Sequence, residues 1–368
     1  MIYFDHNATT PVDERVVEAM LPYFRQLYGN PSSLYRLGRI ARSAVDTARE
    51  QVAALIDVPA AQILFTNGGT EANALALASA RGRRLWVSAI EHPAVAENAF
   101  RRAEHYRAVN ALPADTAGVV SPGTIAEQGL QAGDFVSLML ANNETGAIQP
   151  VADWADKIKA VGGLLHTDAV QAMGKMPVSF KRLGVDLMSL SSHKIYGPKG
   201  CGALAWQAGV DIQPLFYGGE QERGLRAGTE NVPAIVGFGK AAELARLELE
   251  QRIARMQTLR GILERQLKTI PGVVIFAEQA ERLPNTVQFG IPAVNGEMLL
   301  MQLDQKNIAV SSGSACATGS EHISPVLAAM AVDALLAKSA IRVSLGKDNT
   351  EQEIDQFVSV LTTLLARN

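Results

Sequence analysis

Charge of one sign, long apolar runs and signal-peptide features are scarce in this chain of 368 residues. Only 19% of the residues are charged, and 34 basic side chains nearly balance 37 acidic ones, which leaves a net charge of −3. This balance argues against nucleic-acid binding through a basic face. No apolar stretch reaches the ~18 residues of a membrane helix, so we expect no membrane partner. Residues 1–6 lack the basic and apolar regions of a signal peptide.

Cysteine is the next scarce residue, since only Cys201 and Cys316 occur. Two thiols cannot form a disulfide framework in a chain of this length, so a reducing cytoplasm is the simplest setting. Cys316 lies in a run of ten small residues, 311–320. Small residues favour a mobile, accessible loop, which a reactive thiol needs. Cys201 begins an apolar segment and is predicted to be a buried, structural cysteine.

Hydrophobic residues are abundant at 48%, enough for a large core. At roughly 150 residues per domain, the length suggests about two domains. Short apolar runs alternate with longer helical patterns over the first three quarters of the chain. This alternation predicts an α/β fold with a mostly parallel sheet covered by helices on both faces. The predicted strands are 63–66, 85–88, 135–140, 164–168 and 186–190, and the predicted helices include 94–103 and 151–160.

The last third follows a different pattern. A long helical pattern covers residues 232–267 and ends before Pro271-Gly272. Such a helix could bridge two domains. The predicted elements beyond it are strands at 273–276, 286–289 and 341–344 and a last helix at 350–365, which together suggest a smaller α+β domain.

A lysine at the end of a predicted strand is the first candidate catalytic residue. Lys194 follows the strand at 186–190 and His193, and precedes a glycine-rich segment. A partly buried amine has a lowered pKa and can form a Schiff base with an aldehyde cofactor. The alternative is a solvated loop lysine.

An acid at the end of another strand suggests the identity of that cofactor. Asp168 ends the strand at 164–168, where open α/β sheets bind ligands. Pyridoxal 5′-phosphate (PLP) needs a carboxylate beside its pyridine nitrogen, which keeps the ring an electron sink. Taken alone, Asp168 could equally be a helix N-cap.

A phosphate site is suggested by Asn67-Gly68-Gly69-Thr70, between a strand and a helix. Glycines let backbone N–H groups approach an anion at a helix N-terminus. The segment matches neither the dinucleotide-binding Gly-x-Gly-x-x-Gly pattern nor a Walker loop. Taken alone it is a weak signal, because many strand-to-helix turns contain these residues.

Two further side chains could contact a cofactor or substrate. His92 follows the second strand and could stack on a flat ring and move protons, although a lone loop histidine is more often structural. Arg342 lies within an apolar strand pattern and could bind a carboxylate through two hydrogen bonds. The alternative is an edge-strand arginine that faces water.

The order and spacing of these motifs resemble one family, the cysteine desulfurases of class V aminotransferase type (NifS/IscS-like, PLP fold type I). The resemblance extends from Asp5 to Gly346. It is carried by the phosphate turn, His92, Asn142-Asn143-Glu144-Thr145-Gly146, Asp168-x-x-Gln171, Ser191-x-His193-Lys194, Arg226-Ala-Gly-Thr229-Glu-Asn and Ser312-Gly-Ser-Ala-Cys316. One residue departs from the pattern, because Tyr35 stands where the family usually has histidine.

The resemblance implies a two-domain architecture and a homodimer. A large PLP-binding domain would comprise residues 14–251, and residues 1–13 and 252–368 would form a small domain with the Cys316 loop. Thr229 would reach the phosphate of the neighbouring subunit, so that two chains share their sites.

The resemblance also implies a role for each motif residue. Lys194 would hold PLP and move the Cα proton, and Cys316 would attack the substrate sulfur. Asp168 would pair with the ring nitrogen, Gln171 would donate to the phenolic oxygen, and His92 would stack on the ring and transfer protons. The phosphate would be bound by Gly69, Thr70, Ser191 and His193. The substrate carboxylate would be bound by Asn143 and Arg342.

The implied reaction converts L-cysteine to L-alanine and leaves a persulfide on Cys316. Its sulfur would pass to an acceptor protein, such as a scaffold for iron–sulfur clusters, and no metal site is expected. A class V aminotransferase needs no such thiol, whereas a selenocysteine lyase shares the fold and is poorly separated by sequence. A cofactor-bearing scaffold without activity is disfavoured because every expected catalytic position is filled. An NAD-binding protein is disfavoured because its glycine motif is missing.

Overall fold

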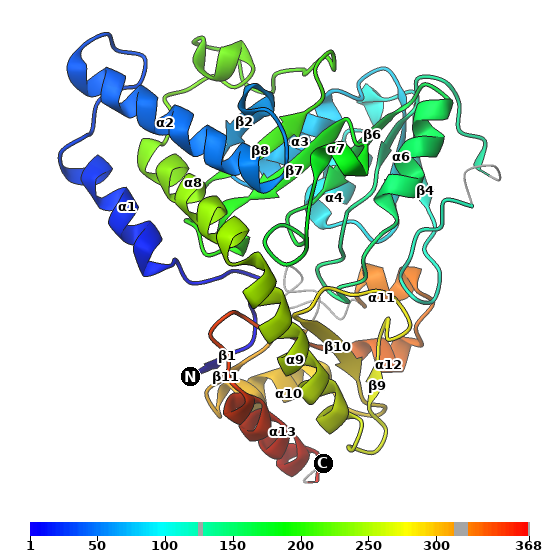
Figure 1. Ribbon diagram of the computed structural model, residues 1–368. Helices are drawn as coiled ribbons and strands as arrows, with labels where there is room; N and C mark the ends of the chain where they lie inside the picture. Colours follow the sequence, from blue (N-terminus) through cyan, green and yellow to red (C-terminus); the bar gives the residue numbers. More distant parts are fainter. Residues whose placement is uncertain (124–127, 313–322, 367–368) are drawn as a thin grey trace.

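Seven strands form the central sheet of the computed structural model, which describes residues 1–123, 128–312 and 323–366 (Figure 1). The four pairings among β3–β7 are parallel, and the two pairings of β8 are antiparallel. The α/β fold with a mostly parallel sheet is therefore confirmed. In spatial order the strands are β2 (Ile63–Thr66), β8 (Gly202–Trp206), β7 (Leu187–Ser191), β6 (Leu164–Asp168), β5 (Phe135–Ser137), β3 (Arg84–Ser88) and β4 (Ala108–Leu112).

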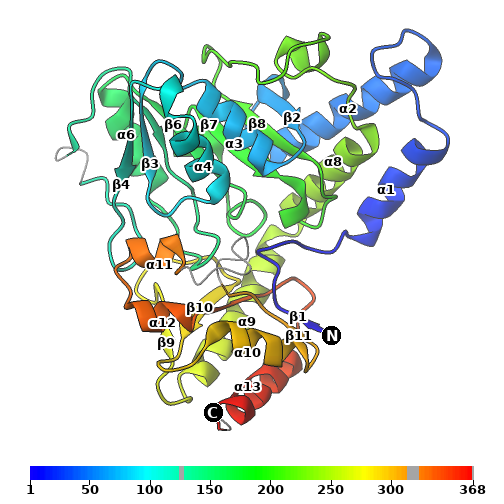
Figure 2. The same cartoon turned by 180° about the vertical axis from the view of Figure 1, so that it is seen from behind.

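Helices cover both faces of this sheet, because neighbouring apolar residues of each strand point to opposite sides. Leu64 packs with α3 (Gly69–Ala78) and α4 (Pro93–Arg101), which lie in front of the sheet in Figure 2. Ile63 packs on the other face, which the remaining helices of this part cover. Those helices are α2 (Arg36–Leu55), α6 (Val151–Ala160), α7 (Phe180–Leu183) and α8 (Val232–Leu247), with α1 (Glu14–Arg25) packed against α8.

A second group of elements has its own sheets and core. An antiparallel sheet has the order β12 (Ile341–Ser344), β10 (Thr286–Gly290) and β9 (Val274–Ile275). The N-terminal strand β1 (Ile2–Tyr3) pairs in parallel with β11 (Ile308–Ala309). The helices that form this core are α9 (Leu249–Leu267), α10 (Gly296–Asp304) and α13 (Glu351–Leu365). The short helices α11 (Pro325–Ala329) and α12 (Ala334–Lys338) bury their apolar residues in the core of the first group. The domain boundaries at residues 14 and 251 stay a prediction.

The long helical pattern at 232–267 forms two helices rather than one, so this expectation was wrong. Glu248 lies between α8 and α9 and leaves helical dihedrals, with φ −103° and ψ 6°. Its carboxylate accepts hydrogen bonds from Arg15 of α1 (2.6 Å) and from Arg252 of α9 (2.8 Å). These tertiary contacts accompany the break, and α9 extends from it into the second group of elements (Figure 1). No helix in the described ranges is long and apolar enough to cross a membrane.

A buried ion pair holds the turn at 221–224 against the central sheet. Arg49 of α2 donates two hydrogen bonds to Glu222, at 2.7 and 2.6 Å, and Glu222 also accepts from the backbone N–H of Phe65. Glu222 has a positive φ of 46°, so these contacts hold a backbone conformation that is uncommon for glutamate.

Replacing Arg49 with methionine should lower the free energy of unfolding by about 3–5 kcal/mol, because the Glu222 carboxylate then stays buried without its partner. Urea denaturation followed by circular dichroism measures the change. Arg101→Met is the control, since it removes an exposed ion pair to Glu97 and should leave the midpoint unchanged. Equal midpoints for the Arg49 and Arg101 variants would contradict the prediction.

Candidate active site

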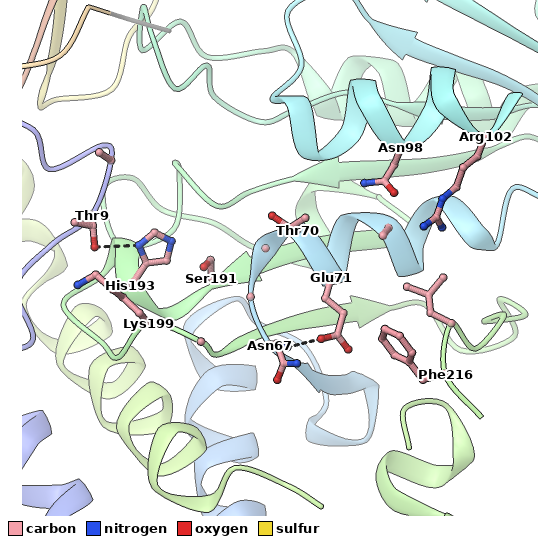
Figure 3. A pocket seen from close by; sticks show the side chains of 16 residues that line it. Thr9, Asn67, Thr70, Glu71, Asn98, Arg102, Ser191, His193, Lys199 and Phe216 are labelled. Carbon is pink, nitrogen blue, oxygen red and sulfur yellow. Dashed lines mark hydrogen bonds between the residues drawn. The ribbon is translucent and has the colours of Figure 1, made fainter. Parts of the chain in front are cut away.

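The predicted phosphate turn lines a cavity of about 740 Å³ at the N-terminus of α3 (Figure 3). A Cβ added to Gly69 would lie 3.0 Å from the side chain of Val170, so glycine lets the backbone lie close to its neighbour. The buried hydroxyl oxygen of Ser191, which also lines this cavity, has no partner among the described residues. Thr70 and His193 complete the set, which fits a phosphate group through backbone N–H groups, hydroxyls and an imidazole.

Asp168 lies at the C-terminal end of β6 with both carboxylate oxygens bonded. Asn73 of α3 donates to Oδ2 at 2.6 Å, and the backbone N–H of Val170 donates to Oδ1 at 2.9 Å. The side chain is buried, with 5% of its surface exposed. The carboxylate is therefore held in one orientation, as an acid that pairs with a ring nitrogen requires.

Lys194 ends the short 3-10 helix Ser192–Lys194 that follows β7. Its Nζ donates to the backbone carbonyl of Ala8 at 2.7 Å and to that of Asn7. The backbone carbonyl of His193 accepts hydrogen bonds from the N–H and the hydroxyl of Thr10. The N-terminal segment therefore contacts the lysine directly, which disfavours the alternative of a solvated loop residue.

His92 is the N-cap of α4, and its Nδ1 accepts a hydrogen bond from the N–H of Ala94 at 3.0 Å. Burial lowers the pKa of His92, and the attraction of Asp168 only partly offsets that shift. A neutral ring whose Nδ1 accepts must carry its proton on Nε2. His92 is thus positioned by its backbone contact, with one N–H left to donate.

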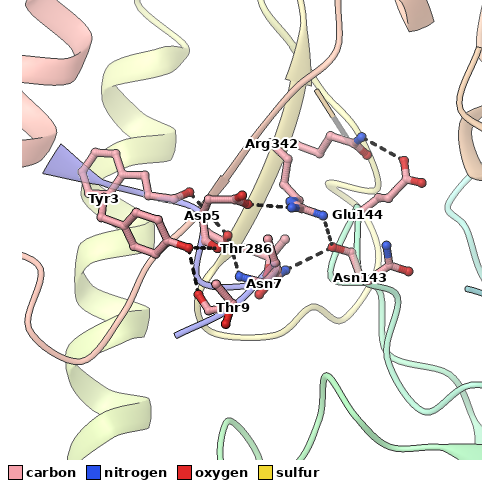
Figure 4. A network of polar contacts seen from close by, with 12 residues as sticks. Tyr3, Asp5, Asn7, Thr9, Asn143, Glu144, Thr286 and Arg342 are labelled. Atoms are coloured by element: carbon pink, nitrogen blue, oxygen red, sulfur yellow. Dashed lines mark hydrogen bonds and ion pairs between the residues drawn. The ribbon is translucent and has the colours of Figure 1, made fainter. Parts of the chain in front are cut away.

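Arg342 of β12 is buried and belongs to the polar network of Figure 4. Its Nη2 pairs with Asp5 at 2.6 Å, and Nη1 donates to the backbone oxygen of Asn143 at 3.1 Å. The guanidinium Nε is buried without a partner among the described residues, as is Oδ1 of Asn143. The structure therefore brings Arg342 and Asn143 together and leaves polar atoms of both available to a ligand.

The two cysteines and Thr229 complete the predicted set. Cys201 is buried just before β8, and burial raises the pKa of its thiol well above the ordinary value. Cys316 lies outside the described residues. Thr229 is exposed and does not line the cavity beside Gly69. Its role stays a prediction that depends on a second chain.

Sequence reasoning gave no role to several residues that the structure places at the site. Asn73 orients Asp168, Asp5 pairs with Arg342, and Asn7 contacts both Lys194 and the second group of elements through Thr286. Asn73 could have been found, because it lies three residues after Thr70 on the same helix face. The contacts of Asp5 and Asn7 join residues more than 100 positions apart, which no local pattern encodes.

A buried histidine, His166, lies in the middle of β6, two residues before Asp168. His166 of β6 forms hydrogen bonds at 2.9 Å with Ser137 of β5 and at 2.9 Å with Ser189 of β7. Burial lowers the pKa of His166 to about 3, against 6.5 for an exposed histidine. The folded state therefore keeps His166 neutral at pH values where the unfolded chain protonates it.

This difference predicts a pH-dependent contribution to stability. The stabilisation is fully present above pH 6.5 and is lost as the pH falls towards 3, because the unfolded state then binds one more proton. His166→Leu should lower the slope of unfolding free energy against pH by up to about 1.4 kcal/mol per pH unit between pH 4 and 6. Urea titrations of both cofactor-free proteins at several pH values measure the slopes. Equal slopes of unfolding free energy against pH for the wild-type protein and His166→Leu would contradict the prediction.

Comparisons with known proteins give a consistent family assignment. The aminotransferase class-V family model matches residues 2–357. Cysteine desulfurase IscS of Dictyoglomus turgidum is 40% identical over 373 aligned positions, which cover 100% of this chain and 95% of that protein. A solved structure of a NifS-like protein has a TM-score of 0.93 and 39% identity, with 100% of both chains covered. The structure of SspA in complex with cysteine has a TM-score of 0.83 and 29% identity, covering 95% of this chain and 100% of that one.

These matches cover the phosphate turn, the strand ends with Asp168 and Lys194, and the strand with Arg342. They agree with the resemblance that the motifs carry. The chain therefore belongs to the class-V aminotransferase family and, within it, to the NifS/IscS-like cysteine desulfurases.

Proposed function

We propose that this chain is a PLP-dependent cysteine desulfurase that converts L-cysteine to L-alanine and transfers the sulfur to Cys316. The observation that supports this most is the convergence of a lysine amine and an oriented carboxylate at the ends of neighbouring strands, beside an anion cradle. Members of the family use PLP, and one structural neighbour is described in complex with cysteine.

The residues present fit PLP. The backbone of Gly69 and Thr70, with Ser191 and His193, would hold the phosphate, and the free hydroxyl of Ser191 needs such a partner. Lys194 would attach covalently to the aldehyde carbon. When bound, PLP accepts the electrons left at the substrate Cα after proton loss. Three other side chains would contact the ring: Asp168 at the nitrogen, Gln171 at the phenolic oxygen and His92 at the face.

The remaining residues act on the substrate. Arg342 would bind the carboxylate through Nε and its Nη groups, with the amide of Asn143 beside it. Lys194 Nζ would take the Cα proton and later return a proton as the product forms. The Cys316 thiolate would attack the substrate Sγ, so that the S–S bond forms as the substrate C–S bond breaks. The balance is L-cysteine plus one thiol giving L-alanine plus one persulfide.

The function is tested by incubating the PLP-loaded protein with L-cysteine and a reductant, and measuring alanine and sulfide together. Equal amounts of both products support a desulfurase. A keto acid without sulfide would support an aminotransferase. Much faster turnover of selenocysteine than of cysteine, measured in parallel, would favour a selenocysteine lyase.

We further propose that two chains form a homodimer and that an acceptor protein, such as an iron–sulfur scaffold, receives the sulfur. Exposed apolar side chains support a surface covered by a second copy. These include Tyr28 (72% exposed), Leu34 (89%), Tyr35 (57%) and Tyr217 (82%). Isologous dimers are also the commonest assemblies of soluble enzymes.

The dimer proposal predicts a role for Thr229, which is exposed in the single chain. Thr229→Ala should weaken PLP retention by about fivefold to tenfold, since one hydrogen bond to a charged phosphate is lost. Equilibrium dialysis measures the retention, and light scattering measures the mass. Ser359→Ala on α13 is the control. A monomer at saturating PLP, or unchanged retention in Thr229→Ala, would contradict the shared site.

A further inference from the structure

A second lysine, Lys175, lies buried beside Lys194 and is not used by the mechanism above. Only 5% of its surface is exposed. It lies in the turns that follow β6, where the preceding Gly174 has φ 72° and a Cβ would come 2.7 Å from the side chain of Ile195. The glycine therefore permits the chain reversal that brings Lys175 beneath the site.

Lys175 Nζ donates two hydrogen bonds to neutral oxygens. One goes to Gln171 Oε1 at 2.7 Å and the other to the side-chain Oδ1 of Asn7 at 2.9 Å. Among the described residues, no ion pair joins Lys175 to a carboxylate. A lysine buried this deeply is rare unless its amine is paired.

The other end of the Gln171 amide points towards Lys194. Gln171 Nε2 donates to the backbone oxygen of Asn7 at 2.9 Å, and Lys194 Nζ donates to the same oxygen. A primary amide nitrogen carries two N–H groups, and the Asn7 oxygen accepts only one of them. The second remains for a ligand next to Lys194.

We propose that Lys175 is a positioning residue for PLP: by binding Gln171 Oε1, it keeps the Nε2 end of the amide turned towards the cofactor's phenolic oxygen. Without this donor, Gln171 Oε1 is a buried acceptor with no partner, and rotation of the amide towards another donor becomes favourable. A rotated amide would present an oxygen to the ionised phenolic oxygen and repel it. This inference rests on the proposed PLP function.

The surroundings of Lys175 offer neutral amide oxygens, so it contacts Gln171 and Asn7 through hydrogen bonds rather than ion pairs. Burial lowers the pKa of Lys175 well below its usual value, and the nearby Lys194 and Arg342 lower it further. An uncharged amine has two N–H groups, as many as the two acceptors here. The titratable groups that face this region are His6, Lys194, Tyr196, Arg252, Arg342 and Lys347.

The test uses two measurements that do not depend on turnover. The first is the dissociation constant for PLP added to the cofactor-free protein. The second is the pH midpoint of the visible absorbance of the bound cofactor. Lys175→Met should weaken PLP binding by about tenfold and raise the midpoint by about one pH unit, because the phenolic oxygen loses a donor.

Matched variants separate positioning from a structural role. Lys175→Arg keeps a donor and should recover most of both effects, whereas Lys181→Met removes an exposed lysine six residues away and should change neither. The decisive comparison is with Gln171→Leu. If Lys175 acts through Gln171, the double variant should have the same midpoint as Gln171→Leu alone.

Two results would overturn the inference: an unchanged midpoint in Lys175→Met, or a further shift of equal size when Lys175→Met is added to Gln171→Leu. If Lys175→Met does not fold, Lys175→Ala gives the same comparison, since it also removes the donor to Gln171. A wild-type protein that binds no PLP would instead refute the proposed function.

Discussion

Lys194→Ala should lose covalent attachment of PLP and nearly all desulfurase turnover. The expected fall in turnover is about 10²–10⁴-fold from loss of the proton-transferring amine alone. The reason is geometric: Lys194 ends the 3-10 turn after β7, and its Nζ is held by the carbonyls of Asn7 and of Ala8, which lines the phosphate cavity. Alanine keeps the backbone of the 3-10 turn and removes only the amine.

The measurement is borohydride reduction of the PLP-loaded protein, followed by digestion and mass spectrometry. The pyridoxyl mass should appear on the peptide that contains Lys194 and be missing in Lys194→Ala. Lys199→Ala is the matched control, because Lys199 lines the phosphate cavity and should not alter the attachment site. Labelling of Lys199 or Lys175 in the wild-type protein would show that another amine holds the cofactor.

Cys316→Ser should abolish sulfur transfer while leaving PLP and cysteine binding intact. The reason starts from the other thiol. Cys201 is buried before β8, and burial raises the pKa of Cys201, so it lacks both the access and the thiolate character of a nucleophile. The chain has only two cysteines, which leaves Cys316 for the persulfide.

The flanks of the segment that contains Cys316 agree with this assignment. The backbone of Ser311 pairs with Arg342 through two hydrogen bonds, and Ser324 donates to Glu144 at 2.6 Å. Both flanking residues therefore contact residues at or next to the proposed carboxylate site.

Mass spectrometry of the intact protein after brief exposure to cysteine, without reductant, measures the persulfide. One added sulfur atom should map to Cys316 and be missing in Cys316→Ser. Cys201→Ser should keep the chemistry and lose about 1–3 kcal/mol of stability, because a hydroxyl replaces a thiol in an apolar core. Normal desulfurase turnover in Cys316→Ser would favour a lyase that releases sulfur directly.

The sequence predicted the central sheet well because its strands are buried on both faces. The helix 151–160 and the strand 164–168 have the predicted bounds. The strand predicted at 135–140 ends instead at Ser137, although the backbone N–H groups of Leu138 and Leu140 still donate to His166 and Asp168 of β6. The break at Glu248 is accompanied by a contact with Arg15, a residue more than 200 positions away. Such a break carries no local sequence signal.

The candidate site could be predicted where chemistry and local structure coincide, as at Asp168 and Lys194 at strand ends. Partners that meet only in the folded chain could not be predicted. The pairing of Arg342 with Asp5 joins the two ends of the sequence. The donation from Lys175 to Gln171 spans only four residues, but it depends on burial beneath Asn7, which a turn sequence does not reveal.

The pairing of β1 with β11 has a consequence for the timing of synthesis. Ile2 and Tyr3 of β1 find their strand partners only after Ile308 and Ala309 have been made, and Asp5 finds its ion-pair partner only after Arg342 has been made. At about 5–20 residues per second, that delay is roughly 15–70 s. The strands of the central sheet all lie between residues 63 and 206. This sheet can therefore form while the N-terminal segment is still unpaired. Completion of the proposed carboxylate site is therefore among the last events in the making of this protein.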